Sequence, residues 1–160
     1  MRKKELEITD PAEIKDVLAR AVVLRLGLFD GETPYVVPVN FGYDDRNALY
    51  IHSGYEGWKM EIIKSHPRVC FEAEADVAVV PPARPENHCG FSMAYRSVIG
   101  FGTAVIIEDP AQKADALKTI VRHLSPERAS EDIVFPEGTV EATAVVRIDI
   151  ESMTGKRDNC

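Results

Sequence analysis

The chain has 160 residues, of which 45% are hydrophobic and 28% charged, and its formal net charge is −7. This length fits one globular domain over residues 1–160 and is too short for two ordinary ones. The charge excludes a general nucleic-acid-binding surface, because an acidic chain with scattered basic residues repels the phosphate backbone. No apolar run reaches the roughly 20 residues of a membrane-spanning helix.

Residues 1–8 carry basic side chains with no apolar stretch behind them. We therefore expect a flexible N-terminus without a signal peptide, and a cytoplasmic protein. A helix is predicted over 11–20. Asp10 suits its N-cap, Pro11 suits the first helical position, and Glu13 completes a capping box.

Three strands are predicted next, separated by polar turns. They lie over 21–29, 34–42 and 48–52. Proline has no backbone N–H, so Pro38 inside the second strand predicts a sheet edge or an interrupted pairing. Such a strand leaves backbone groups free to meet a ligand.

The third strand runs through a small polar turn, 53–57, into a predicted helix over 57–65. A turn of this kind presents free N–H groups at the positive end of the helix dipole, which is a cradle for phosphate. Lys59 lies in the first helical turn, where a cation is favourable only beside an anion. The alternative is an ordinary turn followed by a solvated lysine.

The second half of the chain contains further strands and one more helix. The strands are predicted over 68–75, 95–107 and 143–150. A proline-rich loop, 77–90, is expected to be mobile, and two glycines in the long strand suggest a bend or a close backbone approach. A helix over 110–124 is capped by Asp109. Its inward side chains are expected to be Ala114, Leu117, Ile120, Val121 and Leu124.

Hairpin-linked strands dominate this order of elements. We therefore expect a mainly β, α+β fold, with about six antiparallel strands in a split or partly closed barrel and a few flanking helices. The segment 98–102 is apolar on both faces, whereas a small barrel has only one inside. The outer face would then need a partner, so we expect a homodimer.

The cysteines and histidines give weaker signals. Cys70, Cys89 and Cys160 are widely spaced, which favours free thiols over disulfides, and no spacing supports a metal site. Cys89 follows the proline-rich loop and would either face a ligand or be a small buried hydrophobe. His52 ends a strand, and a lone histidine is more often structural than functional.

Five motifs come in the order and spacing of a known family. They are YVVPVNFG at 35–42, LYIHS at 49–53, EGWK at 56–59, Cys89, and YRSVIGFG at 95–102. In this pattern the chain resembles the flavin-binding split-barrel proteins related to pyridoxamine 5′-phosphate oxidase, and most of all their nitroimidazole-resistance branch. The resemblance implies FMN in a groove between the two subunits of a homodimer.

The resemblance also implies roles for particular residues. The strand residues that would follow the flavin ring are Val36, Val37, Pro38, Val39 and Asn40. His52 and Ser53 would flank the ribityl phosphate, and His52 would also take part in the chemistry. Trp58 and Lys59 match an Arg–Lys pair that holds the phosphate in the oxidase. Tryptophan in place of arginine implies either weaker phosphate binding or a positive charge from elsewhere.

Two residues of the long strand have further implied or open roles. Ser97 matches a flavin contact that the partner subunit provides. Arg96 would bind the phosphate or pair with a surface carboxylate. The ring also needs an apolar wall. Candidates for it are Val37, Val39, Phe41, Ile99 and Phe101.

These features predict an FMN-dependent oxidoreductase that reduces a small organic substrate, such as a nitroimidazole or nitroaromatic, with NAD(P)H as a candidate electron donor. A non-catalytic flavin- or haem-binding protein and a cofactor-free ligand-binding barrel are the alternatives. Oxidation of pyridoxamine phosphate is disfavoured, because the C-terminal Trp and Arg-rich segment of the oxidase is not recognisable.

Overall fold

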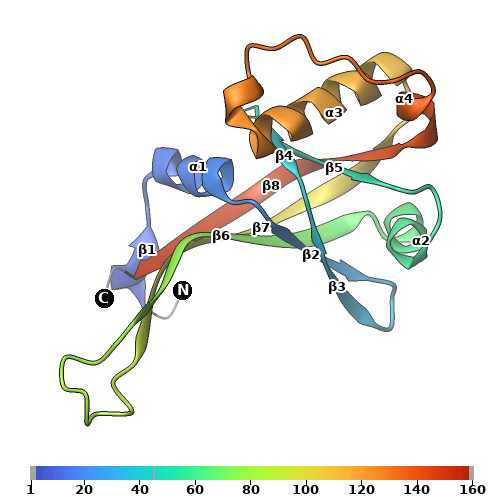
Figure 1. Ribbon diagram of the computed structural model, residues 1–160. Coiled ribbons are helices and arrows are strands. Elements are labelled where there is room, and N and C mark those ends of the chain that lie inside the picture. The colour runs from blue at the N-terminus through green and yellow to red at the C-terminus, as the bar shows by residue number, and fades with distance from the viewer. Residues whose placement is uncertain (1–2, 45, 159–160) are drawn as a thin grey trace.

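A computed structural model of the protein describes residues 3–44 and 46–158, so Asp45 of a predicted turn and Cys160 lie outside the described residues. The fold is built on one eight-stranded sheet with the order β3-β2-β6-β7-β8-β5-β4, and β1 adds to β8 (Figure 1). Every pairing is antiparallel. The strands are β1 Glu7–Ile8, β2 Leu24–Phe29, β3 Pro34–Val39, β4 Gly42–Asp44, β5 Ala48–Ser53, β6 Arg68–Val80, β7 Ser92–Ile107 and β8 Ala144–Asp158.

The helices flank this sheet. They are α1 Pro11–Arg20, α2 Trp58–Ser65, α3 Pro110–Leu124 and α4 Thr139–Ala142, with 3-10 turns at Lys4–Leu6 and Pro126–Arg128. The predicted caps are present, because the Asp10 carboxylate accepts from the Ala12 N–H and that of Asp109 from the Gln112 N–H. Among the described residues, no helix has the length and apolar character needed to cross a membrane.

The expected class, a mainly β antiparallel fold with a few helices, is confirmed. The expected count of six strands is not confirmed, because the sheet has eight, including β1 with two residues and β4 with three. The sheet is also open, with β3 at one end of the strand order and β4 at the other. Pro38 therefore lies in an edge strand, as its missing N–H predicts.

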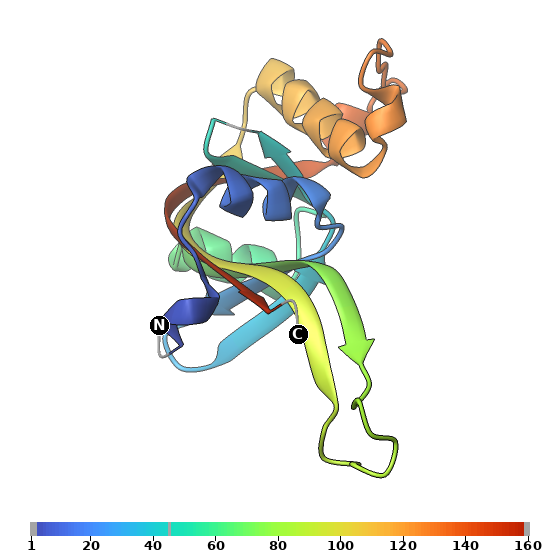
Figure 2. The same ribbon diagram turned by 90° about the vertical axis from the view of Figure 1, so that its left-hand side faces the viewer.

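The long strands extend further than predicted. The first residues of the predicted loop, 77–80, continue β6, and β7 begins at Ser92. The two strands and the loop between them form an arm that projects from the body (Figure 2). At the other end of the chain, Glu7 and Ile8 of the expected flexible N-terminus 1–8 form β1, which pairs with β8. Ile8 is only 3% exposed and belongs to the main core, whereas residues 1–2 of this segment lie outside the described residues.

The sheet curls around a single main core. The strands next to the two edge strands, β2 and β5, contribute buried leucine and isoleucine side chains, and α1 and α2 close the core. Phe71 of β6 lies at its centre with no exposed surface. Gly100 is its direct partner on β7, and a Cβ at this glycine would lie 2.2 Å from Cζ of Phe71. The predicted close approach at a β7 glycine is therefore confirmed.

A second, smaller core lies under α3, on the other side of the sheet. The buried face of this helix is rotated about the helix axis relative to the predicted one. Its buried side chains are Lys113, Ala116, Leu117 and Ile120. Leu124, expected to point inward, is 39% exposed. Lys113 is buried in place of the predicted Ala114.

His123 in the last turn of α3 ties the helix to the segment before β2. Its Nε2 lies 2.8 Å from the carbonyl oxygen of Ala21, and its ring centroid lies 4.4 Å from that of Phe41. Burial lowers the pKa of His123 below its usual 6.5, and the hydrogen bond to Ala21 only partly opposes this. The folded state therefore prefers the neutral imidazole.

We expect a pH-dependent loss of stability from this residue. His123 binds a proton more readily in the unfolded chain than in the folded one. Its contribution to the free energy of unfolding is therefore complete above pH 6.5 and is lost as the pH falls through the lowered pKa of the folded state. Urea unfolding at several pH values between 5 and 8 should show a shallower decline in His123→Gln than in the parent protein. Equal declines would contradict this assignment.

Candidate functional site

The edge strand β3, the turn after β5 and the start of α2 meet at one corner of the molecule. The ring of Trp58, the first residue of α2, packs on that of Tyr35 in β3 with centroids 4.5 Å apart. Trp58 remains 45% exposed. The tryptophan thus fastens the helix start to the edge strand and presents half of its surface to a ligand.

The start of α2 differs from those of α1 and α3. Gly57 at its N-cap has φ of 109° and no capping side chain, so the first N–H groups of the helix are not capped by a side chain. Lys59 is the second residue of the helix and is half-buried. Burial lowers the pKa of Lys59, and within the described part of the chain no carboxylate opposes this. A desolvated cation beside uncapped amides is a suitable environment for an anion.

The predicted flavin-ring segment lies beside this corner. Val36 is 63% exposed, whereas Val37 and Val39 are half-buried and pack on the main core. Pro38 and Asn40 are exposed. In the described sheet β3 pairs only with β2, so its second edge keeps unpaired backbone groups.

The outer face of the sheet next to β3 is apolar and hollowed. A cavity of about 750 Å³ is lined by residues of β2, β3, β6 and β7 together with the end of α2. Phe101 on this face is 45% exposed and Ile99 is 46% exposed. The prediction that Phe41 joins the wall is wrong, because Phe41 has no exposed surface and packs on His123 in the core.

The two residues predicted to flank the phosphate end β5. His52 pairs with Val145 of β8 and is exposed, whereas Ser53 pairs with Ala144 and is half-buried. Neighbouring strand residues point to opposite faces. Because Ile51 is buried in the core, His52 lies on the opposite, outward face of β5. Both precede the turn that leads to Lys59.

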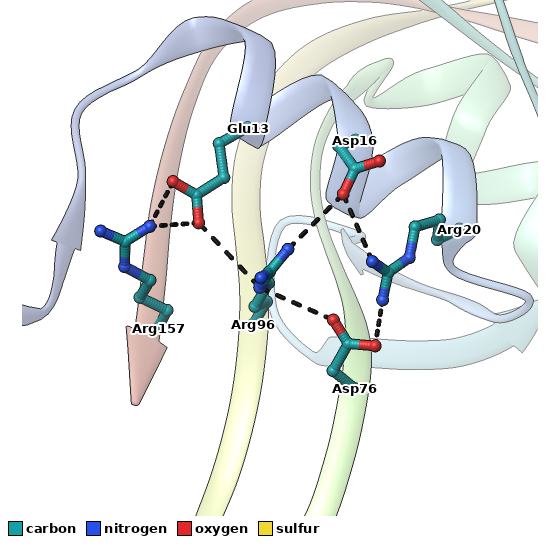
Figure 3. Close-up of polar contacts among 6 residues, drawn as sticks. All are labelled: Glu13, Asp16, Arg20, Asp76, Arg96 and Arg157. Carbon is teal, nitrogen blue, oxygen red and sulfur yellow. Dashed lines mark hydrogen bonds and ion pairs between the residues drawn. The ribbon is translucent and has the colours of Figure 1, made fainter. Parts of the chain in front are cut away.

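Arg96 lies in a charged network at the opposite end of the sheet, where α1 crosses β6, β7 and β8 (Figure 3). Its guanidinium is 3.6 Å from a carboxylate oxygen of Asp16 and 3.6 Å from one of Asp76. Glu13 joins Arg96 to Arg157. Of the two predicted roles for Arg96, pairing with carboxylates is the one observed, and within one chain Arg96 is not brought to the corner of Lys59.

Ser97 points to the other face of β7, because successive strand residues alternate. It lines a hollow of about 370 Å³ on the outer face of the sheet with Tyr95 and Ile99. Cys89 is exposed in the loop of the arm, so its alternative as a small buried hydrophobe is wrong. The chain itself places neither residue at the Lys59 corner.

Sequence reasoning missed a polar contact behind the turn. The Lys113 ammonium on α3 donates to the Tyr55 hydroxyl at 2.7 Å, and this hydroxyl donates to the backbone carbonyl of Glu141 at 2.7 Å. Lys113 is 4% exposed. The helical spacing that it shares with Ala116, Leu117 and Ile120 was the available signal, but a lysine is not expected at a buried position.

Comparisons with known proteins agree with this fold. A family model described as pyridoxamine 5′-phosphate oxidase matches residues 10–157. A candidate 5-nitroimidazole antibiotic resistance protein of Bacteroides thetaiotaomicron is 32% identical, with a TM-score of 0.79 over 94% of this chain and 86% of that one. A search of curated proteins finds no significant match.

Two further solved structures share the fold at lower identity. The flavocytochrome Anf3 of Azotobacter vinelandii is 24% identical, with a TM-score of 0.80 over 100% of this chain and 72% of that one. A FAD- and haem-binding protein of Mycobacterium smegmatis is 20% identical, with a TM-score of 0.81 over 96% of this chain and 74% of that one.

Proposed function

The chain belongs to the pyridoxamine 5′-phosphate oxidase family, and we propose that it is an FMN-dependent oxidoreductase that reduces a small organic substrate, such as a nitroimidazole or another nitroaromatic. NAD(P)H is the proposed electron donor. The observation that carries the proposal is the half-buried Lys59, for which the described residues show no acidic partner, at an uncapped helix start beside an exposed apolar sheet face. The similarity to a candidate nitroimidazole resistance protein supports the substrate class.

The residues of the corner fit the parts of FMN. Lys59, Ser53 and the first amides of α2 would hold the phosphate. Unpaired backbone groups of β3 would meet the polar edge of the ring, and Trp58 would border it. The bound flavin supplies electron or hydride transfer. In this assignment the exposed imidazole of His52 donates a proton to the reduced substrate.

We also propose a homodimer with the cofactor between the subunits. The outer face of the sheet exposes several large apolar side chains that a single chain leaves in water. They include Phe29 at 50%, Val36 at 63%, Ile99 at 46% and Phe101 at 45%. Burying this face against a second copy would bring Ser97 of the partner subunit toward the flavin. Light scattering showing a monomer at micromolar concentration would refute this arrangement.

The finer fold assignment follows from the same proposal. Apart from the short strands β1 and β4, the six remaining strands are those we assign to a split barrel. In such a barrel the sheet opens between its edge strands instead of closing. The edge strand β3 would lie at this opening, beside the flavin ring.

The visible spectrum of the isolated protein tests the cofactor. We expect a yellow preparation that absorbs near ~450 nm, or a colourless one that becomes yellow when FMN is added and the excess is removed. A Soret band would favour a haem protein, and failure to retain FMN would favour a cofactor-free binding protein. Consumption of NAD(P)H that depends on a nitroimidazole then separates an enzyme from a flavin carrier.

A further inference from the structure

Lys113 is a buried cation for which the described residues provide no counter-charge. Its side chain is 4% exposed. Its ammonium contacts the Tyr55 hydroxyl and lies 5.3 Å from the centroid of the Tyr55 ring. No ion pair with a carboxylate is found for it in residues 3–44 and 46–158. Burying a charge without a partner is costly, so an anion is expected to lie near it.

The position of Lys113 in its helix adds to this cost. It lies at the start of α3, where the helix dipole is positive, and the first turn contains no acidic residue. Asp109 lies four residues earlier, but its carboxylate caps the helix by accepting from the Gln112 N–H at 2.8 Å. Lys59 is the second residue of α2 and also lies in the first turn of its helix, which it shares with Glu61. Two lysines thus stand at the positive ends of two helices.

Tyr55 connects these two helix starts. It belongs to the turn 54–57 between β5 and α2, which we assign to the FMN phosphate, and its hydroxyl joins Lys113 of α3 to the backbone before the end of α4. In Figure 1 this turn runs between α2 and the layer formed by α3 and α4. Lys113 is therefore joined to this turn through the side chain of Tyr55.

We propose that Lys113 is a positioning residue of the phosphate cradle, which holds Tyr55 of the turn 54–57 and adds a second positive charge beside that side chain. The inference rests on the proposed function. It would account for Trp58, where the resemblance to the oxidase implies an arginine, because the second charge would come from α3. Because Lys113 is desolvated, its field acts on a nearby phosphate with little screening.

Affinities for FMN and riboflavin test the proposal, because the two flavins differ only in the phosphate. Their Kd values are measured by flavin fluorescence for the parent protein, Lys113→Met, Tyr55→Phe and the control Lys118→Met, which removes a charge from a more exposed position of the same helix. Lys113→Met should raise the Kd for FMN about tenfold and that for riboflavin less than about twofold. Tyr55→Phe should raise the Kd for FMN about threefold.

The heat-denaturation midpoint of each flavin-free variant separates a binding effect from a loss of folding. Tyr55 is 47% exposed, so Tyr55→Phe keeps the test available if Lys113→Met does not fold. An unchanged ratio of riboflavin to FMN affinity in Lys113→Met and Tyr55→Phe would overturn the role of Lys113 while leaving the proposed function in place. A parent protein that binds neither flavin would overturn both.

Discussion

Replacing Gly100 with alanine is expected to lower the free energy of unfolding by about 3 kcal/mol, at the upper end of the usual cost of overpacking a core. The new Cβ would lie 2.2 Å from Cζ of Phe71, and the two other nearest atoms belong to the same ring. Phe71 has no exposed surface and is held by the main core, so its ring has no free space to move into. Urea unfolding of the variant measures the loss.

Gly27→Ala is the matched control for this experiment. Gly27 also lies inside a strand, β2, but the nearest atom to a Cβ there is the Cys70 carbonyl oxygen at 3.4 Å, an ordinary contact. We expect a change within about 1 kcal/mol, because alanine suits a strand better than glycine does. If both variants lose the same stability, the contact with Phe71 is not the cause.

A double mutant tests the contact directly. Phe71→Leu alone should destabilise the protein by leaving space in the core. Combined with Gly100→Ala, the smaller side chain relieves the clash, so the double mutant should lose less than the sum of the two single variants. A strictly additive result would mean that the backbone, and not the ring, absorbs the strain.

Replacing Lys59 with alanine is the second large expected effect. It should weaken FMN binding by about 1–3 kcal/mol, the range for losing a charged hydrogen-bond partner, which corresponds to roughly a 5- to 150-fold higher Kd. The half-buried lysine loses hydration and gains no acidic partner from residues 3–44 and 46–158, so the phosphate is the group that would compensate it. Titration of the flavin-free protein with FMN, followed by fluorescence, measures the change.

Lys64→Ala is the control, since Lys64 lies in the last turn of the same helix and is exposed. It removes the same charge from α2 at the opposite end, and its Kd for FMN should stay within about twofold of the parent value, because exposed charges are screened over this distance. Equal weakening in both variants would indicate a general effect of net charge. No weakening in Lys59→Ala would refute its role at the phosphate.

The sequence predicted the helices best where local chemistry defines their ends. α1 and α3 begin and end at the predicted residues, because an aspartate cap followed by proline sets the first turn without help from distant residues. β8 shows the opposite case. It was predicted to end at residue 150, but it continues to Asp158 because the mostly polar residues after Ile150 pair with β7 and β1. Such pairing joins residues that are far apart in the sequence, and it leaves little hydrophobic pattern by which the end of the strand could be predicted.

The candidate site was predicted only in part, for a similar reason. The corner around Lys59 follows from a continuous stretch of chain, whereas the Tyr55–Lys113 contact joins residues 58 positions apart. Arg96 shows a second limit. The sequence did not decide whether Arg96 pairs with a phosphate or with a carboxylate. One carboxylate partner is Asp76, which has a positive φ of 57° and is brought beside α1 by the β6 bulge.

The prolines of β3 also affect how this protein behaves at high concentration. Pro34 and Pro38 are the first and fifth residues of a six-residue strand, so their missing N–H groups would lie on the same side of it. A strand proline is accommodated when that side faces away from the ladder. The free border of the sheet then offers carbonyl oxygens but only the Val36 amide as a donor between them. An extended peptide from another molecule would find too few donors to add itself there, which protects an apolar border against fibril-like stacking while a small ligand can still bind.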